Sequence, residues 1–380
     1  MEQRKYGKQP WSVGIFGMGC LRVPQTKDEA GNTVIDREPA TALVRRAIDR
    51  GVNYLDTAAL YQDGDNEAWL GEALRDGYRE KVKLVTKLPL WLLSEEADIE
   101  RTFEEECRRL NTDFIDVYLL HSMCREYWDI AKKFHALDHL VALREQGRIG
   151  AIGFSFHDGP DIFREMVDAF DWDMCQLQLN ILDAYKQATI EGLRYAAKKG
   201  LAVVIMEPLQ GGRLANVPDY VQKIYDQWPE RRSPVEWAMR YLYSMPEVTC
   251  ILSGVSTVEQ LDDNLRIFES ARANVMTKGE LAIVDQVRAA FESHMAVGCT
   301  ACGYCQPCPK TVDIPAVFAR WNGAAVFGEW EKMRDRFARL EKAGHGPSAC
   351  IACGKCQSHC PQHLPIIQKL QEAKAALGEG

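Results

Sequence analysis

Residues 82–121, VKLVTKLPLWLLSEEADIERTFEEECRRLNTDFIDVYLLH, contain two apolar runs separated by an amphipathic stretch. The runs at 82–86 and 115–120 are short, apolar and partly β-branched, as in strands that are buried on both faces. Between them, residues 99–110 carry apolar side chains at intervals of three and four, which predicts a helix. A strand, a helix and a second strand in this order predict a βαβ unit with parallel strands.

The same alternation runs through the first 290 residues. We expect further strands at 13–17, 53–56, 151–154, 174–179, 202–206 and 249–252, and further helices at 40–50, 134–145, 189–199, 234–244 and 258–270. Eight strands with alternating helices predict an α/β fold, a (β/α)8 TIM barrel over residues 1–290. The glycine-rich dinucleotide turn of a doubly wound open sheet is missing after the first strand.

The composition is that of a globular protein, with 46% hydrophobic and 26% charged residues and a net charge of −8. The charges are spread without long runs of one sign, which argues against a basic face for nucleic acid. The N-terminal residues are polar, and no apolar stretch reaches the ~18 residues of a membrane helix. We therefore expect a cytoplasmic protein that binds neither nucleic acid nor membrane.

Eight of the 13 cysteines lie between residues 299 and 360. In a reducing cytosol, clustered cysteines at short regular spacing indicate metal or cluster ligands. This density predicts a second domain over residues 291–380, ferredoxin-like and mainly helical. A charged stretch near 315–342 is expected to form a helical insert between its two cysteine motifs.

The second motif reads C-x2-C-x2-C-x3-C-P, the run of bacterial ferredoxins, in which the fourth cysteine ligates the other cluster. The first motif is one residue shorter before its last cysteine. We predict two [4Fe–4S] clusters, one held by Cys299, Cys302, Cys305 and Cys360 and the other by Cys350, Cys353, Cys356 and Cys308. Two structural zinc sites are the alternative, but such sites rarely have a third cysteine at this spacing followed by Cys-Pro.

Polar residues follow three predicted strands at their carboxyl ends, where TIM barrels place their active sites. Asp56 ends the second strand, Lys87 follows the third and His121 follows the fourth, with Tyr61 five residues beyond Asp56. In this chain order the four residues resemble the catalytic tetrad of the aldo-keto reductase family. The resemblance extends over residues 14–268.

The resemblance implies an oxidoreductase that reduces a carbonyl or oxidises an alcohol, with Tyr61 as the general acid/base. A tyrosine hydroxyl has a pKa of about 10, so this role requires neighbours that stabilise the tyrosinate. We expect Lys87 to lower the pKa of Tyr61, Asp56 to hold Lys87 charged, and His121 to donate a hydrogen bond to the carbonyl oxygen. At the mouth of the barrel, Arg22 is a candidate contact for an anionic substrate.

The resemblance also implies a site for NADP(H) or NAD(H). The residues that match cofactor-binding positions of the family are Ser155, Gln176, Asn180, Pro208, Leu209, Gly211, Ser253, Gly254, Ser256, Gln260 and Asn264. The chain departs from the family pattern at Phe156, where an asparagine is usual, and at Met206, where many members have an aromatic ring. Ser256 and Gln260 stand where NADPH-preferring members have a lysine and an arginine.

A barrel of this kind with both cysteine motifs resembles the subgroup of aldo-keto reductases that has a C-terminal ferredoxin-like extension. The first hypothesis is an NAD(P)H-linked carbonyl reductase or alcohol dehydrogenase whose clusters serve a redox partner protein. The second is single-electron, ketyl-type reduction of a small carbonyl substrate, fed by the clusters without nicotinamide. The third hypothesis is a non-catalytic electron-transfer or regulatory component, because one fold can carry unrelated functions.

Overall fold

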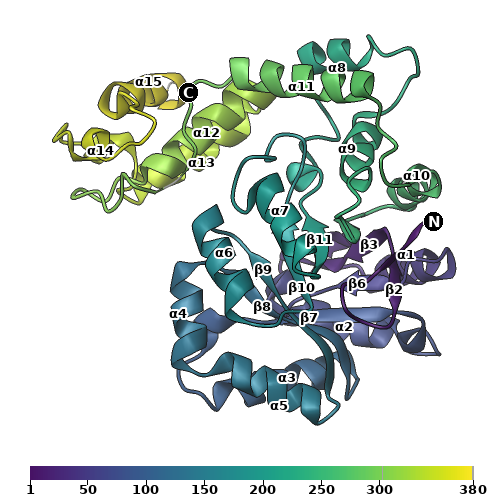
Figure 1. Cartoon of the computed structure of the whole chain (residues 1–380). Coiled ribbons are helices and arrows are strands. Elements are labelled where there is room, and N and C mark those ends of the chain that lie inside the picture. The colour runs from purple at the N-terminus through teal and green to yellow at the C-terminus, as the bar shows by residue number, and fades with distance from the viewer. Residues whose placement is uncertain (302, 379–380) are drawn as a thin grey trace. The chain divides into compact units, whose positions relative to one another are not determined.

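The computed structural model describes residues 1–301 and 303–378 of the chain. The chain forms two compact units, which Figure 1 lets the reader follow by colour. The first comprises Met1–Gly211 and Val235–Thr277, and the second comprises Gly212–Pro234 and the residues from Lys278 onward. These two units are defined by how the chain packs. The boundary between two domains at residue 290 therefore remains a prediction.

The first unit is a closed barrel of eight parallel strands, so the predicted fold class is confirmed. In pairing order the strands are β3 (Phe16–Gly19), β6 (Tyr54–Asp56), β7 (Lys83–Leu88), β8 (Ile115–Met123), β9 (Ile149–Phe156), β10 (Met174–Gln178), β11 (Ala202–Met206) and β12 (Cys250–Ser253). β12 pairs with β3 and closes the barrel.

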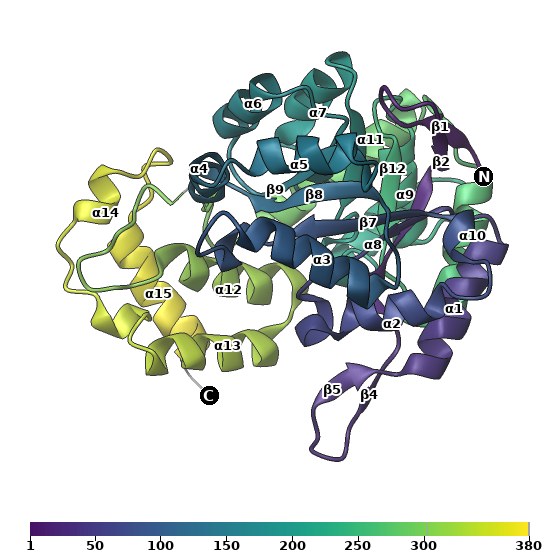
Figure 2. The ribbon, with the colours of Figure 1, turned by 90° about the horizontal axis from the view of Figure 1, so that it is seen from below.

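Helices cover the outside of the barrel, and Figure 2 shows α3 and α5 beside strands β7 to β9. The helices of this unit are α1 (Arg37–Asp49), α2 (Asp65–Ala73), α3 (Asp98–Leu110), α4 (Arg125–Lys133), α5 (Ala136–Glu145), α6 (Pro160–Ala169), α7 (Thr189–Lys198), α9 (Pro234–Tyr243) and α10 (Val258–Glu269). The helix expected at 134–145 begins at Ala136 because His135 has a left-handed φ of 51°. No described helix combines the length and apolarity needed to cross a membrane.

The first predicted strand, 13–17, was placed too early. Residues Ser12–Gly14 form β2, which pairs antiparallel with β1 (Gln3–Lys5), and the barrel strand β3 begins at Phe16. This hairpin delivers Tyr6 and Val13 into the barrel core, where the hydroxyl oxygen of Tyr6 lies 2.9 Å from that of Tyr54. A second hairpin, β4 (Gln25–Lys27) and β5 (Thr33–Ile35), was not predicted.

The regular elements described in the second unit are all helices, and its cysteine motifs lie in the loops between them. It contains α8 (Asp219–Tyr225), α11 (Lys278–Ser293), α12 (Ile314–Phe327), α13 (Trp330–Lys342), α14 (Lys355–Ser358) and α15 (Ile366–Gly378). The predicted insert is thus two helices, separated at Gly328, whose φ of 69° provides the left-handed end that glycine favours. Apolar side chains of α12, α13 and α15 form its core, among them Phe318, Phe337 and Leu370.

A buried carboxyl pair lies between β7 and the helices α2 and α3. The Glu67 carboxylate is fully buried and accepts hydrogen bonds from Thr86 Oγ1 at 2.5 Å and Arg109 Nε at 2.7 Å. Glu106 is also fully buried, and burial, followed by the charge of Glu67, raises the pKa of Glu106 well above its ordinary value. Glu106 therefore keeps its proton to a higher pH in the folded protein than in the unfolded chain.

Replacing Glu106 should stabilise the fold as the pH rises. Because the pKa of Glu106 is higher in the folded protein than in the unfolded chain, its protonated carboxyl contributes stability that is fully present below the unfolded pKa of about 4.3. This contribution to the free energy of unfolding falls by about 1.4 kcal/mol per pH unit as the pH rises toward the folded pKa. Glu106→Gln does not ionise, so the melting temperature of the variant minus that of the native protein should grow between about pH 5 and pH 8. Glu105→Gln, at an exposed position of the same helix, is the control. A difference that stays constant with pH would contradict the prediction.

Candidate functional site

The alternation of side chains along the strands brings the predicted catalytic residues to one end of the barrel. On β7, Val85 belongs to the barrel core, so Lys87, two residues further, also points inward. The same alternation directs Asp56 on β6 and His121 on β8 inward at the carboxyl ends of their strands. Tyr61, in the loop after β6, completes the group.

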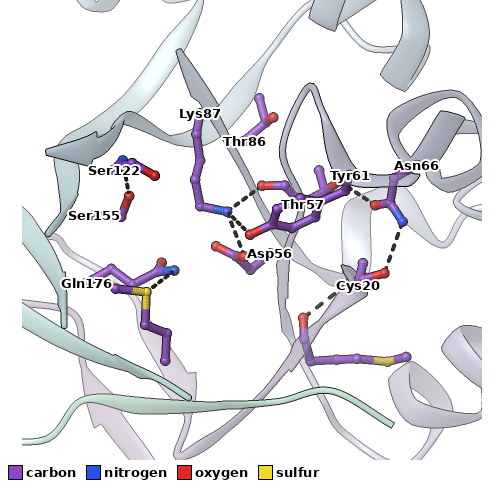
Figure 3. Close-up of polar contacts among 12 residues, drawn as sticks. Cys20, Asp56, Thr57, Tyr61, Asn66, Thr86, Lys87, Ser122, Ser155 and Gln176 are labelled. Carbon is purple, nitrogen blue, oxygen red and sulfur yellow. Dashed lines mark hydrogen bonds and ion pairs between the residues drawn. The ribbon is translucent and has the colours of Figure 1, made fainter. Parts of the chain in front are cut away.

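Lys87 is the centre of this group, as Figure 3 shows. Its Nζ donates to Asp56 Oδ1 at 2.7 Å, to the Thr57 carbonyl oxygen at 2.6 Å and to the Tyr61 hydroxyl at 3.2 Å. Lys87 and Asp56 are 1% and 2% exposed, so their charges are shielded from solvent. Three acceptors for three ammonium hydrogens leave the lysine fully satisfied.

The protonation states differ in part from expectation. Burial by itself lowers the pKa of Lys87, but Asp56 and Tyr61 outweigh it, and the pKa is raised. Burial raises the pKa of Tyr61 more than Lys87 lowers it, so the net shift is upward and the expected net lowering is wrong. Tyr61 is therefore a protonated hydroxyl at neutral pH, held against a charged ammonium.

His121 is neutral in this site. Burial, followed by the charges of Lys87 and His157, lowers the pKa of His121 to about 2. Its Nδ1 is buried and has no hydrogen-bond partner among the described residues. The rings of Trp91 and Tyr61 contact the imidazole, with centroid separations of 5.1 and 6.3 Å. Trp91 thus forms an apolar wall beside the histidine.

Asn66, at the start of α2, holds the loops around Tyr61 together and was not anticipated. Its buried amide donates to the Cys20 carbonyl oxygen at 3.0 Å, and Thr57 Oγ1 donates to Asn66 Oδ1 at 2.5 Å (Figure 3). The amide also donates to Gln62 Oε1 at 2.6 Å. Asn66 therefore connects the loop after β3 to the loop after β6. The helix α2 was not among the predicted helices, and an asparagine gives no sequence signal of burial.

The predicted nicotinamide contacts on β9 and β10 lie at the carboxyl ends of these strands. Ser155 is buried and its Oγ accepts the Ser122 N–H at 2.8 Å. Gln176 donates to Met206 Sδ at 3.7 Å, while its Oε1 is buried with no partner among the described residues. Asn180 instead donates to Asp183 Oδ2 at 2.9 Å, so its amide is engaged within its own loop.

The other predicted cofactor residues lie in two loops and the helix after the second. Pro208, Leu209 and Gly211 follow β11. The end of β12 and its loop contain Ser253, Gly254 and Ser256, and α10 carries Gln260 in its first turn and Asn264 near its middle. Within the second loop, Ser256 N–H donates to Gln260 Oε1 at 2.8 Å, and Asn264 donates to Ser253 Oγ at 2.9 Å. Gln260 thus engages a backbone N–H that could otherwise receive an anion.

Arg22 lies between these two loops. A Cβ added at Gly254 would stand 3.0 Å from Arg22 Cβ, and one added at Gly211 would stand 3.4 Å from the Arg22 guanidinium. The Ser256 hydroxyl also donates to the Arg22 carbonyl oxygen at 2.7 Å. Arg22 therefore places a cation beside both loops. The sequence alone suggested it only as a contact for an anionic substrate at the mouth of the barrel.

In the second unit, cysteines from both motifs line two adjacent pockets. We call the first set the Cys308 group and the second the Cys299 group; they consist of Cys308, Cys350, Cys353 and Cys356, and of Cys299, Cys305 and Cys360. Cys305 also touches the first pocket, and Cys302, a predicted ligand, lies outside the described residues. No three Cys, His, Asp or Glu side chains of the described ranges are close enough together to bind a single metal ion. In each group the last motif cysteine comes from the other segment of the chain.

The two cysteine loops share one backbone conformation, which suits cluster binding. Ala301 and Ala352 have φ values of 57° and 53°, and Gly303 and Gly354 have φ values of 78° and 77°. Left-handed residues of this kind turn successive N–H groups toward one side and form concave anion sites, as in many Fe–S proteins. The Ala301 N–H accordingly donates to Cys299 Sγ at 3.4 Å. The conformation of these residues fits a [4Fe–4S] cube that is held by anionic cysteine thiolates.

Comparisons with known proteins divide the chain into a barrel part and a cysteine-rich C-terminal part. The model described as the Aldo/keto reductase family matches residues 17–288, and that described as a 4Fe-4S dicluster domain matches residues 298–364. An uncharacterised oxidoreductase of Bacillus subtilis, YqkF, is 26% identical over 312 residues, which span 74% of this chain and 94% of YqkF. The methylglyoxal reductase YeaE of Escherichia coli is 34% identical over 193 residues, covering 49% of this chain and 63% of YeaE.

Solved structures share the barrel. The holo form of aldo-keto reductase AKR11C1 from Bacillus halodurans has a TM-score of 0.63 at 24% identity, over 76% of this chain and 96% of that protein. An aldo-keto reductase from Klebsiella pneumoniae in complex with NADPH has a TM-score of 0.59 at 23% identity, with the same coverage of both chains. At these identities the likeness is one of fold.

Paired cysteine variants should separate crossed from sequential ligation. If the Cys308 group holds one cluster, Cys308→Ser with Cys353→Ser damages only that cluster and leaves about four irons per chain. Cys360→Ser with Cys353→Ser damages both clusters and leaves almost none. Iron analysis and absorbance near 400 nm measure this in protein purified without oxygen. Cys124→Ser in the barrel is the control, and the reverse pattern would show sequential ligation.

Proposed function

Because the chain belongs to the aldo/keto reductase family and ends in a 4Fe-4S dicluster domain, we propose that it is an NAD(P)H-linked carbonyl reductase. Its clusters exchange single electrons with a separate redox partner. The observation that carries the proposal is the contact of Lys87 Nζ with Asp56 and the Tyr61 hydroxyl, at 2.7 and 3.2 Å. Such a group serves to transfer a proton beside a developing alkoxide.

In this reaction Tyr61 protonates the carbonyl oxygen. A reduced nicotinamide, when bound, supplies the hydride to the carbonyl carbon. Tyr61 holds its proton at neutral pH because its pKa is raised, and the ammonium of Lys87 stabilises the tyrosinate that remains. Asp56 keeps Lys87 charged and oriented, and neutral His121 donates a hydrogen bond to the same oxygen.

The nicotinamide site is supported by an unsatisfied buried acceptor. Gln176 Oε1 has no donor among the described residues, although it lies two residues beyond Met174 of the barrel core. The carboxamide N–H of a nicotinamide is a donor of the required type, and Arg22 lies beside the two loops that would receive the phosphates. The Klebsiella pneumoniae protein with this fold was solved with NADPH.

The substrate is a small carbonyl compound or the corresponding alcohol. Trp91, whose ring lies 5.1 Å from that of His121, packs on Tyr127 at a centroid separation of 5.3 Å and a tilt of 36°. These side chains give the space above the catalytic group an apolar wall. The relative YeaE is named for the reduction of methylglyoxal, a small dicarbonyl.

The clusters would be held by the Cys308 group and by the Cys299 group together with Cys302. They supply one-electron transfer, whereas a nicotinamide gives two electrons as a hydride. Direct exchange between the two needs a carrier that splits the electron pair. We therefore assign the clusters to a route of their own, toward a one-electron partner.

Tyr61→Phe should lower kcat for carbonyl reduction by about 10²- to 10⁴-fold while NAD(P)H still binds. Because the pKa of Tyr61 is raised and that of His121 is about 2, neither titrates in the neutral range, and native kcat should be constant between about pH 6 and pH 9. Steady-state rates with a panel of aldehydes measure both effects. Tyr127→Phe, which keeps its ring contact with Trp91, should retain activity. Unchanged activity of Tyr61→Phe would favour the non-catalytic hypothesis.

A second candidate function is single-electron reduction of the substrate without nicotinamide. The observation that favours it is the loop after β12, where Gln260 bonds to Ser256 N–H and supplies no cation for a 2′-phosphate. The clusters would then deliver electrons singly, with Tyr61 again the proton donor.

Nicotinamide titration separates the two candidates. If the NAD(P)H-linked candidate is correct, Gln260→Arg should tighten NADPH binding about 10- to 100-fold and leave NADH binding unchanged. The reason is that a guanidinium forms charge-assisted hydrogen bonds with the 2′-phosphate, which NADH lacks. Gln227→Arg, at an exposed position elsewhere, is the control. If neither nucleotide binds the native protein or the variant, and reduced clusters reoxidise on adding a carbonyl compound, the second candidate replaces the first.

A further inference from the structure

The cysteine segments of the second unit carry an unusual charge distribution. Residues 299–312 and 342–371 contain four lysines and no Asp, Glu or Arg, whereas the chain as a whole has 54 acidic and 46 basic residues. Lys369 is paired at 2.8 Å with Glu372, just beyond the second segment. The remaining lysines leave these segments with an excess of positive charge on a protein whose net charge is negative. A bound cluster with four thiolate ligands is itself anionic, so it provides a counter-charge for the lysines near it. Only the lysines at the rim of the cluster pocket also face solvent.

Three side chains of these segments lie at the rim of the pocket lined by the Cys308 group. Lys310, Ile351 and Lys355 all line that pocket, and all three are exposed. Ile351 is 58% exposed, and it stands between Cys350 and Cys353 in the chain. The contacts of Lys310 and Lys355 with described residues involve their backbone carbonyl oxygens, and neither ammonium forms an ion pair or hydrogen bond with any of these residues. We call these three residues the Lys310 surface.

We propose that the Lys310 surface is the docking site for an acidic one-electron carrier protein. The inference rests on the proposed function, in which the Cys308 group holds a cluster. Its exposed apolar centre with charged side chains at the rim is the arrangement of protein interfaces. Unpaired lysines attract an acidic partner over a distance of about the Debye length and speed its association.

In the complex one electron passes from the reduced centre of the carrier to the cluster of the Cys308 group. The carrier is oxidised by one electron, the cluster is reduced by one, and no bond is formed or broken. Docking on this surface places the carrier against residues that line the same pocket as the cluster ligands. Docking here therefore brings the carrier close to the cluster ligands, which shortens the distance that the electron must cross.

A second basic pocket of the same unit provides a matched control. Arg320 on α12 and Arg336 and Arg339 on α13 line it together with Leu340, and no cysteine is among its lining residues. Arg336 and Arg339 are exposed. Reversing two charges there changes the net charge by the same amount as reversing Lys310 and Lys355.

The test compares these two double variants in the full-length protein with its clusters loaded. The probe is an acidic plant-type [2Fe–2S] ferredoxin, reduced chemically and mixed with the oxidised protein in a stopped-flow instrument. At an ionic strength of about 20 mM, Lys310→Glu with Lys355→Glu should lower the second-order rate of cluster reduction about 10- to 100-fold. Arg336→Glu with Arg339→Glu should change it less than about twofold. The difference should nearly vanish at about 1 M salt, where the Debye length is 3 Å.

Ile351→Ser tests the apolar centre independently of charge. It should weaken equilibrium binding of the ferredoxin, measured by calorimetry, several-fold at low and at high salt. Iron content and the midpoint potential of each cluster are measured for every variant. Unchanged rates in the lysine variant would overturn the proposal, as would an equal or larger loss in the arginine variant. A rate loss that a shifted midpoint potential accounts for would also overturn it.

Failure of the inference and failure of the proposed function give different results. If NAD(P)H-dependent carbonyl reduction requires Tyr61 and the clusters assemble, but the ferredoxin reacts alike with all variants, only the docking surface is wrong. If iron analysis shows no clusters in the native protein, the electron route of the proposed function is wrong and the docking surface is wrong with it.

Discussion

The buried ion pair of Lys87 with Asp56 is the interaction on which the candidate site depends. A charge in the interior must be paired, because an unpaired ammonium would cost several kcal/mol of desolvation. Here the ammonium has a carboxylate at 2.7 Å, a backbone carbonyl oxygen at 2.6 Å and the Tyr61 hydroxyl at 3.2 Å. Removing any of these acceptors leaves Lys87 with an unmet donor. The lysine therefore fixes β7 against β6, which supplies Asp56, and against the loop after β6, which supplies Thr57 and Tyr61.

The barrel is built so that this pair can exist. The pairing of β6 with β7 sets Asp56 opposite Val85, two residues before Lys87, so the lysine side chain reaches back to the carboxylate. The opposite end of the barrel is closed by Tyr6 and Val13, which the N-terminal hairpin inserts into the core. Water is thus excluded from the core below the pair, and above it Trp91 packs on His121. The resulting low polarity keeps Tyr61 protonated and His121 neutral.

The second unit solves a different problem with a repeated local structure. The two cysteine loops have matching left-handed residues and each receives its last cysteine from the other segment. Both loops pack on one apolar core formed by α12, α13 and α15. The chain therefore combines an aldo/keto reductase barrel with a 4Fe-4S dicluster domain, and in the proposed function the two exchange electrons with different partners.

The sequence by itself determined the alternation of eight barrel strands with helices, the residue types at the strand ends and the cysteine spacing. Those features are local, because alternation and spacing are set by neighbours along the chain. Only the tertiary structure decided that residues 12–14 join a hairpin, that Asn66 connects two loops, and that Gln260 bonds to Ser256. It also decided the net pKa of Tyr61, since that value balances burial against the charge of Lys87. Each of these depends on contacts or burial in the folded chain, which no local pattern encodes.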